Sequence, residues 1–172
     1  LDDYHLHEYS LRDGSCRQLT EGLGRADYEP IYLPDGEILF SSTRPEQSVP
    51  CWWTEISNLY RMDARGKHIR RLAIDQVHAL YPQLMADGRV VYTRWDYNDR
   101  GQVYPHPVFS MQPDGRDQRA FYGGNSWFPT SLLHTRGIPG SHKAMSIAAG
   151  HHTWQQGKLV VLDTRVGRDE GP

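Results

Sequence analysis

Two hairpin patterns that alternate along the chain restrict its possible folds more than any other feature. The first pattern runs from Tyr28-Glu29-Pro30 through Asp35-Gly36 into an apolar stretch, and it returns about 50 residues later from Tyr81-Pro82 through Asp87-Gly88. An Asp-Gly pair between two apolar runs predicts a tight hairpin, because Gly accepts the positive φ that closes the turn. The chain therefore repeats a hairpin at a fixed interval.

The second hairpin pattern lies between the copies of the first. The stretch from Asn58 to Gly66 returns as Pro107 to Gly115, again about 50 residues later. Weaker copies lie at residues 6–14 and 158–167. Two alternating hairpins form one four-stranded antiparallel unit, and the interval between units is typical of a propeller blade.

These patterns divide the chain into expected blades. We expect a half blade at residues 1–20 and blades at about 25–73, 78–122 and 126–167. No segment shows helical spacing of apolar residues over three turns, and the 16 Gly and 11 Pro residues would interrupt most helices. The expected fold is all-β, a β-propeller fragment of about three and a half four-stranded antiparallel blades. A β-sandwich is the alternative, but a sandwich does not predict a repeated pair of hairpins.

Charge and hydropathy exclude several functional classes. The formal net charge is -2, so the chain lacks the basic field that gathers nucleic acid, and we expect no nucleic-acid partner. No run of 18 or more apolar residues occurs, so no membrane span is expected. Residues 1–30 are too polar for the core of a signal peptide. No nucleophile elbow, P-loop or dinucleotide fingerprint is present, so the sequence contains no catalytic motif.

The repeat rhythm resembles a known family. Pro, then Pro-Asp-Gly, then Leu-Tyr-x-Met-Asp-x-x-Gly is similar to the TolB-type propeller repeat of exported and periplasmic proteins, over nearly the whole chain. More specific loop strings resemble the propeller-containing middle domain of the hydrazine synthase alpha subunit; they lie at residues 40–45, 51–55, 92–101, 125–129 and 150–152.

This resemblance implies a six-bladed or larger ring within a multidomain protein that is periplasmic or secreted. The implied partners are the remaining blades, flanking domains and protein subunits. The implied role is that of a scaffold or a ligand-binding or partner-binding module, and the alternative is part of a haem-dependent oxidoreductase in which this segment lines the haem pocket. A c-type haem or a metal ion would then belong to the full-length protein, because this chain has no Cys-x-x-Cys-His. The haem-ligating Tyr of the family has no counterpart after His151 and His152.

Aromatic and charged residues at strand ends are the candidates for binding loops. We predict ligand or partner contacts from Trp52, Trp53, Arg94, Trp95, Asp96 and Asp99. Packing between blades is the other interpretation of the tryptophans, and it is the one we favour for Trp127 and Phe128. A calcium loop that begins at Asp96 would have Arg100 at its fifth position and Pro107 at its twelfth, where ligands are required. Asp96 and Asp99 are therefore expected to bond nearby arginines or backbone amides.

Histidines are the candidates for metal ligands. His134, His151 and His152 fall in the third inner hairpin or the loop after it, and Cys51 could add a thiolate. Adjacent His151 and His152 would point to opposite faces of an extended chain, and surface or turn-bonded histidines are the alternative. Only Cys16 and Cys51 are available as thiols; a disulfide between them and two separate buried thiols both stay open.

Overall fold

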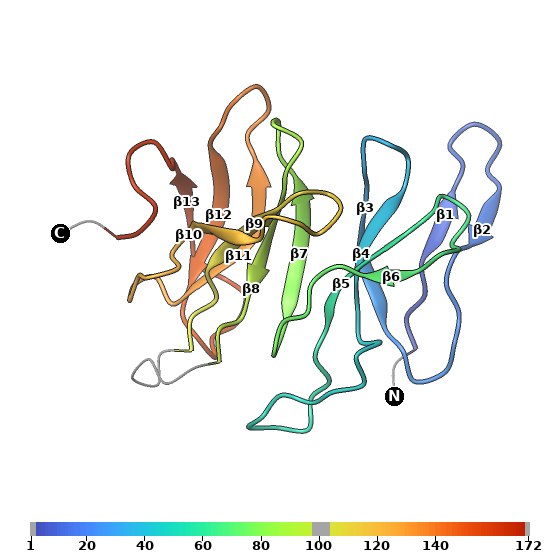
Figure 1. Cartoon of the computed structure of the whole chain (residues 1–172), viewed down its shortest axis with the longest axis horizontal. Helices are drawn as coiled ribbons and strands as arrows, with labels where there is room; N and C mark the ends of the chain where they lie inside the picture. The colour runs from blue at the N-terminus through green and yellow to red at the C-terminus, as the bar shows by residue number, and fades with distance from the viewer. Residues whose placement is uncertain (1–2, 98–103, 171–172) are drawn as a thin grey trace.

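The computed structural model describes residues 3–97 and 104–170, and in these ranges the chain forms strands, turns and loops without a helix (Figure 1). All strand pairs are antiparallel. The thirteen strands are β1 (His7–Tyr9), β2 (Cys16–Gln18), β3 (Asp27–Tyr32), β4 (Ile38–Ser42), β5 (Asn58–Met62), β6 (Arg70–Arg71), β7 (Ala79–Leu84), β8 (Val90–Arg94), β9 (Val108–Met111), β10 (Arg119–Tyr122), β11 (Ser131–Gly137), β12 (Ala144–Ala149) and β13 (Lys158–Leu162).

Four separate sheets follow one another along the chain, and Figure 1 shows them side by side in sequence order. We call β1–β2 the half blade, β3–β6 blade 1, β7–β10 blade 2 and β11–β13 blade 3. Within each sheet, neighbouring strands are consecutive in the sequence. This arrangement confirms the predicted all-β fold of antiparallel propeller blades. The described residues contain no helix that is long and apolar enough to cross a bilayer.

Blade 3 departs from the four-stranded expectation, because the described residues give it three strands. After β13 the chain turns at Asp163, whose carbonyl accepts from Val166 N. It then returns to blade 2, where Arg168 O accepts from Gly123 N at 2.8 Å. The residues after β13 are therefore bonded to the end of blade 2 and do not pair with β13.

A bulge repeats at the same place in the first strand of every blade. The strand register shifts between Tyr28 and Ile31, between Leu80 and Gln83, and between Leu133 and Arg136. The bulged positions are the three non-glycine residues Glu29, Tyr81 and His134, with φ of 55°, 57° and 51°. Pro30 and Pro82 of the repeated motif directly follow two of them, so the motif marks a bulge as well as a strand.

Apolar layers between the sheets hold the stack together. Ile38, Phe40 and Met62 on one side of blade 1 pack under Leu6 and the partly buried Leu19 of the half blade. The other side of blade 1 packs on blade 2 through Leu39, Leu59, Val90, Tyr92 and Met111. Blade 2 packs on blade 3 through Met85, Val91, Val108, Leu132, Ala144 and Leu162. Each full blade thus uses one side toward the preceding unit and the other toward the following one.

Glycines in the outer hairpins allow this close stacking. A Cβ on Gly66 would lie 2.1 Å from the carbonyl oxygen of Leu19 in the preceding unit. Gly115 takes the same place relative to Leu72, with the Cβ of Leu72 at 3.2 Å. Both glycines also have positive φ, so the repeat requires Gly here for the turn and for the approach of the neighbouring sheet.

The far side of blade 3 is uncovered in the described structure. Leu59 and Val108 occupy equivalent register positions in blades 1 and 2 and are 0% exposed, whereas Leu159 at that position in blade 3 is 67% exposed. Val161 is 57% exposed, while its equivalents in the other blades are buried. This side carries the apolar character of an interface between blades without the neighbouring sheet.

Candidate site at the aromatic loop end

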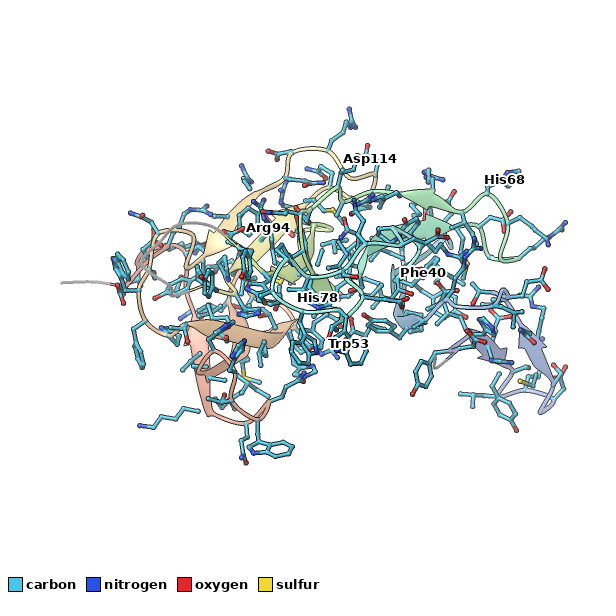
Figure 2. The ribbon with its side chains drawn as sticks, turned by 90° about the horizontal axis from the view of Figure 1, so that it is seen from below. Phe40, Trp53, His68, His78, Arg94 and Asp114 are labelled. Carbon is cyan, nitrogen blue, oxygen red and sulfur yellow. The ribbon has the colours of Figure 1, made fainter. Side chains whose placement is uncertain are left out.

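The candidate site lies at the end of the sheets where the loops after β4, β8 and β12 emerge. The loop after β4, drawn in teal, lies at the lower edge of Figure 1, and Figure 2 looks onto this side with Trp53, His78 and Arg94 labelled. These loops belong to three different blades. The site is therefore assembled by the radial arrangement of the sheets and not by one local motif.

Trp95 is the centre of the site. It follows β8 directly and is 9% exposed. Its ring stacks on His78, with centroids 5.7 Å apart, and on His106, with centroids 5.1 Å apart. Tyr97 meets the same ring edge-on at 5.6 Å. We call these side chains, together with Tyr104, His151 and His152, the Trp95 cluster.

His151 connects the cluster to blade 3. Its ring lies 5.7 Å from that of Trp95 and 5.3 Å from that of His106. The backbone N–H of His151 donates to Thr130 Oγ1 at 2.8 Å, which anchors the loop after β12 to the connection between blades 2 and 3. His152 stacks on His151 at 3.9 Å. The expectation that these two imidazoles point to opposite faces is wrong, because His152 has a φ of 57° and the chain is not extended there.

A buried amide fixes the loop that carries His78. Asn58 of β5 donates from Nδ2 to Val77 O at 3.1 Å and accepts at Oδ1 from Asp75 N at 2.8 Å. These bonds hold the connection between blades 1 and 2 against β5. Nδ1 of His78 then accepts from Ser57 N at 3.1 Å, so the ring is held in place beside Trp95.

Burial lowers the pKa of three imidazoles of the cluster, those of His78, His106 and His151. Burial lowers the pKa of His78 to about 4. Burial, with a smaller contribution from the neighbouring His151, lowers the pKa of His106 to about 3. Burial also lowers the pKa of His151. These three rings therefore add no formal charge to the aromatic surface around Trp95 at neutral pH.

Two buried polar atoms of the cluster have no hydrogen-bond partner among the described residues: the indole Nε1 of Trp95 and Nδ1 of His151. Buried polar groups are paired in the great majority of cases. An unpaired indole N–H in this position can donate to an acceptor that comes close to the ring.

A pocket of about 590 Å³ opens beside Trp95. Its wall includes Cys51, Trp52, His78, Trp95 and His152. The Cys51 thiol is free and exposed, and its hydrogen bond with the phenol of Tyr97 raises the pKa of Tyr97 to about 12. The volume lies in the range of small-molecule sites, roughly 300–1,000 Å³.

The predicted loop residues divide between this pocket and its support. Trp52 lines the pocket, and Trp53 lies beside it with ring centroids 6.0 Å apart; both are exposed. Arg94 Nε donates to Asp96 Oδ1 at 2.8 Å and lies 3.5 Å from Asp75 Oδ1, so Arg94 and Asp96 are paired with each other. Asp99 lies outside the described residues. A binding role for these residues stays a prediction.

The four predicted metal ligands do not gather at one point, although His151 and His152 stack on each other and His152 shares a pocket wall with Cys51. His134 lies in β11, where its ring is 4.0 Å from that of Tyr81 and its Nε2 is 3.0 Å from Gln155 Oε1. In the described ranges, no group of three or more His, Cys, Asp or Glu side chains is placed to hold a metal ion. The metal hypothesis for His134, His151, His152 and Cys51 therefore has no support from this geometry.

Two further expectations are corrected. Cys16 and Cys51 are both free and exposed, so they are neither paired in a disulfide nor buried. Trp127 and Phe128 are mostly exposed and do not fill the space between blades. Their backbone N–H groups donate to the carboxylate of Glu170 at 2.7 and 2.8 Å, which fixes the chain with these side chains outward.

Sequence reasoning missed His78, His106 and the bulge residue Glu29. The register places Ala26 in blade 1 where blade 2 has His78. The large ring of His78 at a position where the preceding blade has a small residue could have marked it as a functional candidate. Glu29 Oε2 accepts from Tyr81 N at 2.7 Å and from Ser41 Oγ at 2.8 Å, and burial raises the pKa of this carboxyl. Nothing in the sequence marks Glu29 as a link between two blades.

Comparison with known proteins gives a likeness of fold. No protein-family model matches the sequence, and no curated protein matches it. Among solved structures, hydrazine synthase of Kuenenia stuttgartiensis is similar with a TM-score of 0.80 and 17% identity, over 92% of this chain and 28% of that chain. TolB of Acinetobacter baumannii is similar with a TM-score of 0.63 and 16% identity, over 92% of this chain and 35% of that chain. A puromycin hydrolase is similar with a TM-score of 0.60 and 20% identity, over 91% of this chain and 22% of that chain.

This chain thus spans about a third or less of the length of each of these proteins. The proteins carry different names and functions, and at these identities they share a fold with the chain and do not show its activity. The repeated blades, the stacking between them and these likenesses agree. The chain has the fold of a TolB-like β-propeller segment.

Proposed function

We propose that this chain is a binding module of a larger exported protein, and that it takes a ligand or a partner segment at the pocket beside Trp95. The observation that carries the proposal is the buried indole N–H of Trp95, which has no hydrogen-bond partner among residues 3–97 and 104–170 and lies among aromatic rings beside a pocket of about 590 Å³. Such a surface favours a flat or aromatic group that also offers a hydrogen-bond acceptor. The module itself acts as a scaffold that presents loops from three blades.

The place of the module in a larger, periplasmic or secreted protein is part of the same proposal. It is supported by the limited share of the matched chains that this chain covers and by the uncovered apolar side of blade 3. Both features suit a segment that has sheets or domains as its neighbours.

The indole N–H signals of this protein provide a direct test. The chain has five tryptophans, and a ¹⁵N-labelled sample would be titrated with indole and with phenol while these signals are followed by NMR. We expect the signals of Trp95 and Trp52 to shift, and the signal of Trp127, which does not line this pocket, to stay in place. Trp95→Phe identifies the central signal, and Trp52→Ala should weaken binding. Equal shifts of all five signals, or none, would contradict the proposal.

A second candidate function is a wall of a haem pocket, in which the haem is carried by another part of the protein. It is favoured by His152 and Cys51, two residue types that ligate haem iron, which share the wall of this pocket. The chain does not fit covalent attachment of a c-type haem, because its two cysteines lie in different elements and no Cys-x-x-Cys-His is present. A Soret band in the full-length protein that moves on His152→Ala would support this candidate. A band that His152→Ala leaves unchanged, or no band, would leave the binding module.

A further inference from the structure

The contacts between blades 1 and 2 include a filled polar gap. Glu37 precedes β4, and Arg61 lies in β5 on the side that faces blade 2. Arg61 donates to the carboxylates of Glu37 and Asp35, and its Nη1 donates to Pro113 O of blade 2 at 2.9 Å. Arg61 is only 6% exposed. Its long side chain therefore fills the space between the two sheets, and two carboxylates balance its charge.

In blade 2 the position equivalent to Glu37 carries the opposite charge, and the position equivalent to Arg61 carries a small neutral side chain. Arg89 precedes β8 as Glu37 precedes β4, and Ser110 pairs with Val91 as Arg61 pairs with Leu39. Arg89 Nη2 lies 3.3 Å from Ser110 Oγ, so the two positions are neighbours in both blades. A serine in place of the filling arginine leaves a cavity of about 450 Å³ between blades 2 and 3.

Cationic groups dominate this cavity. Arg89, Arg119 and Arg168 line it, and Asp87 is the one carboxylate among its described lining residues. Asp87 Oδ1 already accepts the backbone N–H of Arg89 in the hairpin turn. His142 also lines the cavity, but it is engaged with Asp163 at 2.8 Å.

The charge of the arginines is only partly balanced. Asp117 is half-exposed and is shared by Arg89, at 2.7 Å, and Arg119, at 3.9 Å. Arg168 Nη1 donates to the backbone carbonyl of Ala120 at 3.3 Å. Arg89 is 9% exposed, and its buried Nε has no hydrogen-bond partner among the described residues. A buried guanidinium N–H without an acceptor is a second, independent sign that an acceptor belongs here.

We propose that this cavity binds a small organic anion, with its oxyanion group held by Arg89, Arg119 and Arg168. Guanidinium groups bind carboxylate and phosphate oxygens with directed, charge-assisted hydrogen bonds. Ser110 adds a hydroxyl, and Val91 and Phe121 give an apolar wall for the body of the ligand. This site is separate from the Trp95 pocket, because Arg89 directly precedes β8 and Trp95 directly follows it at the other end of the strand.

Blade 1 supplies the design of the decisive variant. The double variant R89E/S110R places the Glu37–Arg61 pair at the equivalent positions of blade 2, which should fill the cavity and remove its central cation. The probes are benzoate and phenyl phosphate, with inorganic phosphate to test the oxyanion alone and benzylamine as the cationic counterpart of benzoate. Binding would be measured by calorimetry and by NMR shifts of the cavity residues, and circular dichroism would verify the fold of each variant.

We expect benzoate or phenyl phosphate to bind the wild-type chain and to lose about tenfold or more of their affinity in R89E/S110R. The single variant R119Q should also weaken binding, and it tests the site if the double variant fails to fold. Arg116→Gln is the matched control, since Arg116 is exposed, is paired with Asp114 and does not line the cavity. A preference for phenyl phosphate or for benzoate identifies the anionic group. No binding of either, equal binding of benzylamine, or unchanged affinity in R119Q would overturn the proposal.

Discussion

Replacing the same leucine of the repeat in two different blades measures how much the neighbouring sheet contributes. Leu59 and Leu159 occupy equivalent register positions, but Leu59 is 0% exposed between blades 1 and 2 while Leu159 is 67% exposed on the far side of blade 3. Leu59→Ala removes a fully packed side chain and leaves a cavity, so it should lower the free energy of unfolding by about 3 kcal/mol. Only a third of Leu159 is buried, and a third of a transfer energy of about 2 kcal/mol gives a loss of roughly 0.7 kcal/mol without a cavity.

Urea unfolding of both variants and the wild type, followed by tryptophan fluorescence, would give these values. A common slope against urea concentration would show that the midpoints report stability alone. We expect the difference between the two variants to be about 2 kcal/mol or more. Equal losses for the two variants would refute the assignment of Leu159 to an uncovered side. A midpoint that depends on protein concentration would show that another copy covers this side.

Three other perturbations test the site and its electrostatics. Folding lowers the pKa of His106 from 6.5 to about 3, so its contribution to stability is present above pH 6.5 and is lost as the pH falls. Between pH 7 and pH 5 this effect should lower the free energy of unfolding by an amount on the order of 2 kcal/mol, and His106→Phe should remove that decrease. Urea unfolding at both pH values would measure it. Burial raises the pKa of Glu29, so stability should fall as the pH rises through the window just above 4.5, and Glu29→Gln should flatten that fall in thermal melts over this range. Iodoacetamide should modify both Cys51 and Cys16, and indole should slow the reaction of Cys51 alone by mass spectrometry; equal protection of Cys16 would count against the pocket.

The hairpins could be predicted from the sequence because their cause is local. An Asp-Gly turn places its Gly at positive φ, as Gly36 and Gly88 do at 83° and 82°, and each apolar run beside it forms a strand. The bulge at Glu29 and Tyr81 could not be predicted in the same way, because neither residue type favours positive φ and the conformation is imposed by the strands around it. The fold followed from turns that repeat, while its irregular positions depend on contacts between blades.

Some members of the candidate site could be predicted from the sequence, but His78, His106 and the arrangement of the site could not. Trp95 and His151 stand out in the sequence as an aromatic and an imidazole at strand ends, but they are far apart along the chain. Only the stacking of the sheets brings them to a ring distance of 5.7 Å, with His106 between blades 2 and 3. The metal hypothesis gained no support from the arrangement either: His134 belongs to β11, where its ring lies against Tyr81 and its Nε2 is 3.0 Å from Gln155 Oε1, and the described residues form no group of ligands around it.

The two sides of each blade are chemically different surfaces, and this limits how the far side of blade 3 can be matched. Leu159 is equivalent to Leu59, and Leu59 packs against the side of the next sheet that is equivalent to the Ile38 side of blade 1. The side of blade 3 that carries Leu159 and Val161 is therefore matched by the opposite side of a blade and not by the same side. A twofold dimer through it would set like against like. A copy that presents its half-blade side to this surface would attach head to tail, and successive copies would each turn in the same rotational sense. Such growth ends as a closed circle when the turns add up to one revolution, and otherwise continues as an open helical filament.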